Sequence, residues 1–158
     1  YFTKLLNSND AWLDRVSVLF VGKLTTEEID LINSLRCQKF IISPVERTIA
    51  LELMTRCSIL LLVTGNQTGC ATGKIFEYMA AGPDIVCFSI VTNEAKNIIE
   101  ETGCGKTIIV GDDVSAFTFF QDITSISIRL PKPERNIEKY NKINQANKVS
   151  YWIQEVCL

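Results

Sequence analysis

The chain contains no histidine, and this absence removes several kinds of chemistry at once. Ser-His and Cys-His catalytic pairs are excluded, and so are most transition-metal sites, because imidazole is the usual base and a leading metal ligand in them. No apolar run approaches the roughly 18 residues of a membrane span, and no signal peptide is visible. We therefore expect neither a resident metal nor a membrane-spanning segment.

An excess of either charge is also missing, since 16 Lys and Arg stand against 18 Asp and Glu, a formal net charge of −2. A nucleic-acid-binding surface needs a basic excess, so the composition argues against nucleic acid as a partner. The length of 158 residues, 47% of them hydrophobic, fits one globular domain with a substantial core.

Paired cysteine motifs are absent, because the six cysteines are scattered without a CxxC pair. Without an export signal, reduced thiols in the cytoplasm are favoured over disulfides. We expect Cys57 and Cys87, which lie beside or inside predicted strands, to act as small buried hydrophobes. The chain also begins at Tyr1 without an initiator methionine, which we interpret as a domain cut from a longer protein.

Apolar runs alternate with helical patterns along most of the chain. The fold class that we predict is α/β, a Rossmann-like open parallel sheet of about five to six strands with helices on both faces. After the last of these strands, the alternation of Ile126, Ile128 and Leu130 is also typical of a strand, although the fold needs none there. The strands are predicted at residues 15–22, 39–42, 58–63, 84–90 and 106–110, and the helices at residues 25–35, 43–56, 73–81, 92–102, from 112 or 113, and within 134–156.

Capping signals set several of these helix boundaries. Thr25 with Glu28 forms a capping box, and Ser43-Pro44 followed by Glu46 predicts a helix that starts at Ser43. Gly103 predicts a helix stop, and Asp112 or Asp113 predicts the cap of the next helix.

The most distinctive stretch runs from Thr64 to Pro83 and joins a buried apolar strand, a glycine-bearing loop and a helix. Helix N-termini bind anions, and ligands of open α/β sheets bind at the carboxyl ends of the strands. Lys74 and Glu77 lie three residues apart on one helix face. A cation beside a phosphate and a carboxylate near sugar hydroxyls suit a nucleoside diphosphate. The alternatives are an exposed Lys74–Glu77 ion pair and, for Lys23, a solvated loop lysine.

Two segments imitate a Walker phosphate loop. The first, residues 103–107 (GCGKT), follows a predicted helix and precedes a strand, the reverse of the required order, and Glu100 stands where a glycine is needed. The second, residues 69–74, has the right context but lacks a hydroxyl after Lys74, because Ile75 follows. Neither segment predicts a P-loop NTPase.

The segment Thr72–Pro83 (TGKIFEYMAAGP) resembles the signature of the family 4 glycosyltransferases of the GT-B fold, in which a lysine-x-x-glutamate helix leads into a small-residue turn. The resemblance extends over nearly the whole chain. Supporting segments are residues 18–23 (VLFVGK), 48–63, 94–105, 139–141 and 148–153.

This resemblance implies a domain that binds a nucleotide-sugar donor. Glu77 would accept hydrogen bonds from the ribose, while Lys74, Lys23 and the amides near Gly73 would neutralise a diphosphate whose charge grows as the sugar departs. Backbone at residues 43–45 would flank the base. No catalytic residue is assigned, and neither a cofactor nor a metal is implied. The donor-binding residues that we predict are Gly22, Lys23, Thr68, Gly69, Thr72, Gly73, Lys74 and Glu77.

One departure from the family pattern is Gly69, where many members carry a second glutamate near the donor sugar. Three alternatives follow: the loop is rearranged, the sugar is held by Asn66, Gln67 or Thr68 instead, or the activity is altered or lost. The basic pair after the first strand is also incomplete, because Lys23 has no second lysine near it. The alternative function is therefore a non-catalytic nucleotide or sugar-phosphate binding or interaction module with a degenerate site; a related nucleotide-sugar epimerase has less support.

The resemblance also implies a domain organisation. Residues 1–15 would be a linker or leftover of an interdomain segment, 16–130 the nucleotide-sugar-binding domain, and 131–158 C-terminal helices that pack toward an N-terminal acceptor domain absent from this sequence. The full enzyme would be a cytoplasmic hexosyltransferase-like protein of polysaccharide biosynthesis, at the inner face of the membrane only through that other half. This half alone would be inactive.

Overall fold

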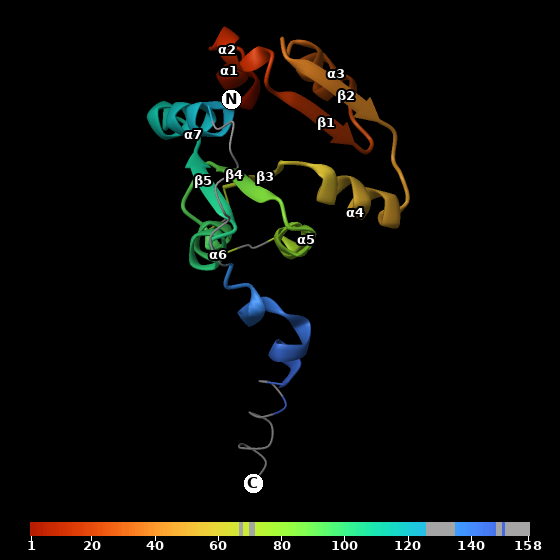
Figure 1. The fold of residues 1–158 in the computed structure, drawn as a ribbon, viewed down its shortest axis with the longest axis vertical. Coiled ribbons are helices and arrows are strands. Elements are labelled where there is room, and N and C mark those ends of the chain that lie inside the picture. Colours follow the sequence, from red (N-terminus) through yellow and green to blue (C-terminus); the bar gives the residue numbers. More distant parts are fainter. Residues whose placement is uncertain (67, 70–71, 126–134, 148–149, 151–158) are drawn as a thin grey trace.

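The computed structural model describes residues 1–66, 68–69, 72–125, 135–147 and 150. Helices and strands alternate through most of this range (Figure 1). The strands are β1 (Ser17–Val21), β2 (Gln38–Ile42), β3 (Ile59–Thr64), β4 (Asp84–Ser89) and β5 (Gly105–Ile109). The helices are α1 (Phe2–Leu6), α2 (Asp10–Leu13), α3 (Thr26–Asn33), α4 (Arg47–Arg56), α5 (Gly73–Ala81), α6 (Glu94–Thr102), α7 (Asp113–Ser125) and the short 3-10 helix η1 (Glu138–Tyr140).

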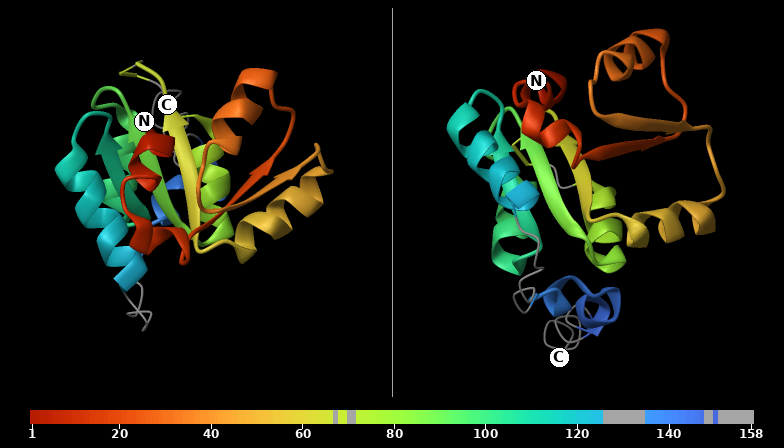
Figure 2. Two further views of the ribbon diagram at one scale, coloured as in Figure 1. Left: turned by 90° about the horizontal axis from the view of Figure 1, so that it is seen from above. Right: turned by 45° about the horizontal axis from the view of Figure 1, so that its top comes forward.

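The strands form two parallel sheets rather than one. The first sheet pairs β1 with β2, and the second has the order β3-β4-β5. The expected α/β class with parallel strands and flanking helices is confirmed and is consistent with a Rossmann-like fold, but the sheets of two and three strands are smaller than the expected sheet of about five to six strands. Figures 1 and 2 show the β1–β2 sheet beside, and not continuous with, the three-stranded sheet.

Helices cover both faces of the three-stranded sheet, and β4 contributes to both sides by simple alternation. Val86 and Phe88 point into a core cluster with residues of α1, α2, α3 and α7. Ile85 and Cys87 point into a second cluster with α5 and α6. Four of the six residues of β4 are buried apolar side chains, as expected for a central parallel strand covered on both faces.

In the β1–β2 sheet, β1 packs against the first core cluster and β2 is more open. Val18 and Phe20 of β1 pack against the cluster that contains Leu5, Leu6 and Trp12 of the first two helices. The strand β2 remains largely open, and Phe40 is 49% exposed. The division into two sheets is a non-local feature, which strand-helix alternation along the sequence does not determine.

Residues 1–15 contribute to the core, because Leu6 and Trp12 are 1% and 2% exposed. The two short helices in this stretch pack on α7, with Trp12 stacked near Phe117 and Phe120. The assignment of this stretch to an interdomain segment stays a prediction.

Most helix boundaries follow the local signals. Both hydrogen bonds of the predicted capping box form, from Glu28 N–H to Thr25 Oγ1 and from Thr25 N–H to Glu28 Oε2. The helix α6 ends at Gly103 in the left-handed conformation, and Asp112 accepts a hydrogen bond from Ser115 N–H at the start of α7. Hydrogen bonds from the side chain and from the backbone of Ser115 hold the pKa of the Asp112 carboxyl below its usual value.

One helix start is placed wrongly by the sequence. The helix α4 begins at Arg47, with Glu46 as its N-cap, and not at Ser43. Residues 43–46 are an irregular connection between β2 and α4. The connection has to leave the first sheet and reach the side of α5 (Figure 1), so the chain runs on past Pro44 before it turns into a helix.

The described part of the C-terminal region packs back on α5 and α6. Arg135 donates to Asp84 Oδ1 and to the Gly82 carbonyl, and Tyr140 donates to Glu101 Oε2 at 3.1 Å. Residues 142–147 are helical. The predicted packing of residues 131–158 toward another domain stays a prediction, and the alternation at residues 126–130 lies outside the described residues.

Candidate functional site

The predicted anion site is the N-terminus of α5, which follows the loop at the carboxyl end of β3. The predicted bounds of this helix, Gly73 to Ala81, are those of the structure. Thr72 is the N-cap, yet its side chain makes no capping hydrogen bond, and its Oγ1 is buried without a partner in the described part of the chain. The first amides of a helix also have no intrahelical partner. This end of α5 therefore carries donors that its own helix leaves unused.

On α5, Lys74 is exposed and Glu77 is half-buried, and the alternative that they pair with each other is wrong. Glu77 Oε1 instead accepts from Arg47 Nη2 of α4 at 2.9 Å. The carboxylate is thus shared between two helices, and Lys74 is not tied to it. Arg47 was missed at the sequence level, because no local spacing relates α4 to α5.

Two glycines of the loop have room for a side chain. A Cβ placed on Gly69 or Gly73 would meet nothing within 4 Å, and neither residue has a positive φ. Neither side-chain packing nor a left-handed backbone conformation therefore requires glycine at position 73. Close approach of a ligand to the backbone would account for it.

The other two predicted residues lie on the other sheet. Gly22 follows β1, has a φ of 142° and donates its N–H to the Ile42 carbonyl at 3.0 Å. Lys23 is the next residue. The structure thus gathers six of the predicted residues in one loop-helix unit and leaves two at the end of β1. These six are Thr68, Gly69, Thr72, Gly73, Lys74 and Glu77.

A buried polar network beneath the loop was not foreseen. Asn93, which is 3% exposed, donates from Nδ2 to Thr64 Oγ1 and to Ser89 Oγ, both at 2.9 Å. Its Oδ1 accepts from Lys96 N–H and so caps α6. Glu94 N–H donates to the Thr68 carbonyl at 3.2 Å. The network therefore fixes the ends of β3 and β4 to the start of α6 and to the loop of the candidate site. The Asn-Glu sequence at a helix start was the available signal.

The GCGKT segment has a structural explanation. Gly103 is the left-handed C-cap of α6, and a Cβ on Gly105 would lie 1.9 Å from the Ile85 carbonyl oxygen. Both glycines are thus required by the turn and by the close approach of β4 and β5. The prediction that this segment is not a phosphate loop agrees with its place after a helix and before a strand.

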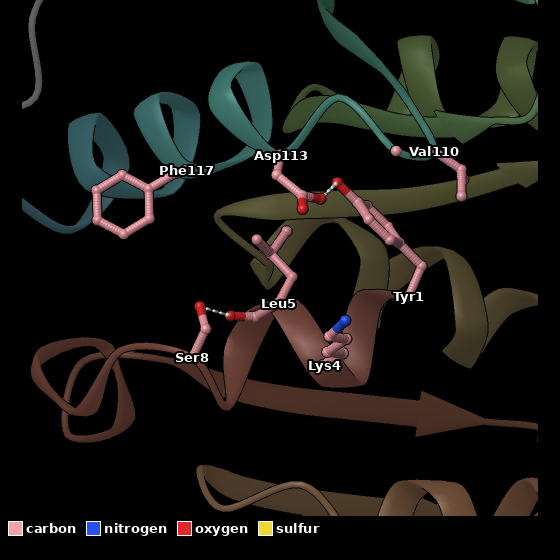
Figure 3. Close-up of a pocket in the computed structure, with 8 residues that line it drawn as sticks. Tyr1, Lys4, Leu5, Ser8, Val110, Asp113 and Phe117 are labelled. Atoms are coloured by element: carbon pink, nitrogen blue, oxygen red, sulfur yellow. Dashed lines mark hydrogen bonds between the residues drawn. The ribbon is translucent and has the colours of Figure 1, made fainter.

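The larger of two described cavities lies away from α5. It has a volume of about 360 Å³, and Figure 3 shows it between α1 and the start of α7. Tyr1 O–H donates to Asp113 Oδ1 across it at 2.8 Å, and burial together with this hydrogen bond raises the pKa of Tyr1 to about 12. Its wall holds both Lys4 and the carboxylate of Asp113, and none of the predicted site residues lines it.

Cysteines behave as the apolar residues that the sequence suggests. Cys37, Cys87 and Cys104 are buried, Cys57 is half-buried, and all four are free thiols. Burial raises the pKa of Cys37, Cys57 and Cys87.

Among the described residues, no group of three or more cysteine and carboxylate side chains is placed to hold a metal ion. The described helices also include none with the length and apolar character needed to cross a membrane. Comparisons of the chain with protein-family models, with curated proteins and with solved structures find no match in any of the three.

Proposed function

We propose that this chain is the nucleotide-sugar-binding half of a glycosyltransferase, one that transfers a sugar from a nucleoside-diphosphate donor to a glycan or a lipid-linked acceptor. The observation that carries the proposal is the start of α5, about one helical turn before Glu77. There the helix N-terminus has no side-chain cap, the space around Gly73 is free, and Lys74 is exposed. A diphosphate at the amides and Lys74 would place its ribose toward Glu77.

The chemistry assigned to this half is stabilisation of the leaving group. As the glycosidic bond of the donor breaks, negative charge builds up on the diphosphate, and prearranged amides and a lysine lower the energy of that charge. Such a role needs neither histidine nor a metal. The acceptor would bind on a second domain, which is the main protein partner that we propose.

The proposal includes a finer fold, in which β1 lies beside β3 in one sheet. The helices already occupy the faces that this arrangement needs. Ile32 of α3 shares a core cluster with α7, whereas α4 packs beside α5 on the opposite face. With right-handed crossovers, these faces fit a continuous parallel order β2-β1-β3-β4-β5. Val63 of β3, which is 69% exposed, would then become less exposed, because β1 would lie beside it.

Joining of the sheets would also complete the site. In an open α/β sheet the ligand crevice lies where the strand order reverses, here between β1 and β3. Gly22 and Lys23 follow β1, and the loop before α5 follows β3. Closure along this edge would bring Lys23 to the same diphosphate as Lys74, as the family resemblance implies.

A second candidate is a nucleotide-binding module without transferase activity, and Gly69 favours it. Because space is open at its Cβ and its φ is not left-handed, glutamate could stand there without strain. The missing carboxylate is thus a chemical difference from the family pattern and not a steric necessity.

The proposal is tested by calorimetric titration of UDP, GDP and ADP and their sugar derivatives. We expect one base to bind, with Lys74→Ala raising Kd about tenfold, since hydrogen bonds to charged groups contribute about 1.5–3 kcal/mol. Lys96→Ala is the matched control, because Lys96 occupies the first turn of the neighbouring helix α6. Absence of binding to every nucleotide contradicts both candidates. Equal affinity for the free diphosphate and its sugar form favours the second.

A further inference from the structure

Arg47 occupies a position that the stability of its own helix does not explain. It is the first residue of α4, where the helix dipole disfavours a cation. Its guanidinium instead reaches across to α5, and Nη2 lies 2.9 Å from Glu77 Oε1. The side chains of Arg47 and Glu77 are 78% and 37% exposed. An ion pair this accessible contributes little to folding.

The partner of Arg47 is the carboxylate to which the proposed function assigns the ribose. A carboxylate has about four acceptor sites, and one contact with a guanidinium leaves others for two hydroxyls. The contact also restricts rotation of the carboxylate, so the remaining acceptor sites keep a fixed direction. In addition, the positive charge offsets that of Glu77, which would otherwise repel a diphosphate bound one helical turn away.

We infer that Arg47 is a positioning residue of the donor site, which holds Glu77 in the orientation that accepts the 2′- and 3′-hydroxyls of a nucleoside diphosphate. The inference rests on the proposed function. It goes beyond the family pattern, because the guanidinium comes from α4, which lies outside the lysine-x-x-glutamate helix. It also gives α4, in which no residue is fully buried, a part in ligand binding.

The test compares a ribonucleoside diphosphate with its 2′-deoxy form in the whole chain, using the base that binds best among UDP, GDP and ADP. In the wild type we expect the deoxy form to bind roughly tenfold more weakly, because it lacks one hydrogen bond to a charged acceptor. In Arg47→Gln this ratio should fall toward one, as it should in Glu77→Gln. Loss of α4 packing alone would weaken both ligands equally and leave the ratio unchanged.

Two further variants sharpen the comparison. Arg47→Lys should restore part of the ratio, and the double variant Arg47→Gln/Glu77→Gln should have no lower ratio than Glu77→Gln alone. Arg56→Gln is the matched control, because Arg56 is on the same helix with a similarly exposed ion pair to Glu52. It should keep the full ratio.

Each failure has a distinct meaning. A full ratio in Arg47→Gln together with a lost ratio in Glu77→Gln overturns the role of Arg47 and leaves the proposed function standing. A full ratio in Glu77→Gln shows that the ribose binds elsewhere and also overturns the inference. If the wild type binds none of the three diphosphates, the inference and the proposed function fall together.

Discussion

Replacement of Asn93 by alanine should be among the most damaging single changes near the candidate site. The side chain of Asn93 is buried and links three elements, because Nδ2 donates to Thr64 Oγ1 on β3 and Ser89 Oγ on β4, and Oδ1 accepts from Lys96 N–H on α6. Alanine removes all three hydrogen bonds. The main-chain contact from Glu94 to Thr68 depends on the same helix start.

The expected cost can be summed from these contacts. Loss of the N-cap contributes about 1 kcal/mol. Thr64 and Ser89 each lose a donor in a buried position, which contributes about 1 kcal/mol apiece. The free energy of unfolding should therefore fall by about 2–4 kcal/mol, which corresponds to roughly 5–15 °C in Tm for a chain of this size.

Urea unfolding of wild type, Asn93→Ala and Asn93→Asp measures this directly. Aspartate keeps the capping acceptor and loses only the two donated bonds, so it should fall between the other two. Asn97→Ala is the control, because Asn97 is an exposed residue of the same helix, and its effect should stay within about 0.5 kcal/mol. If Asn93→Ala is no more destabilising than Asn97→Ala, the buried network does not form.

Three shorter predictions follow from the packing. Gly105→Ala should lower the free energy of unfolding, measured with denaturant, by about 3 kcal/mol or more, because its Cβ would overlap the Ile85 carbonyl. The control Gly69→Ala should be nearly neutral, and equal effects of the two changes would contradict the packing of β4 on β5. Hydrogen bonds from Lys139 and Tyr140 lower the pKa of Glu101 below 4.5, so the stabilisation from this contact is complete above that pH and lost as the pH falls through the lowered pKa. NMR shifts of the Tyr140 ring should change below pH 4.5 in wild type and not in Glu101→Gln, and a change above that pH refutes the assignment. Burial raises the pKa of the Cys87 thiol, so Cys87 should resist alkylation at pH 8 until denaturant is added; rapid reaction in the native state would contradict its burial.

Local signals account for what the sequence predicted well. The bounds of α5, the capping box at Thr25 and the stop of α6 at Gly103 each depend on residues within one or two helical turns. Such local signals do not depend on tertiary contacts, so they can be recognised in the sequence. The strands were placed within a residue or two for the same reason, since each is a short apolar run between turn residues.

What the sequence did not predict is non-local. Whether β1 pairs with β3 is a matter of contact between distant segments, which the residues of β1 alone do not determine. The helix signal at Ser43-Pro44 did not predict the helix start, because residues 43–46 form the connection between β2 and α4. Arg47 and Glu77 are 30 residues apart in the sequence, so only the folded structure reveals their contact. The candidate loop was recognised, but the residues that support it from other elements were not.

The most direct test of the central claim is to titrate UDP, GDP and ADP into ¹⁵N-labelled protein and to follow the backbone amides. We predict that one of the three shifts the signals of residues 73–77 at the start of α5, and that the wild type gains about 2.7 kcal/mol of stability at a hundredfold excess over Kd. Shifts confined to the cavity lined by Tyr1 and Asp113, or no shifts at α5 with any of the three, would contradict it.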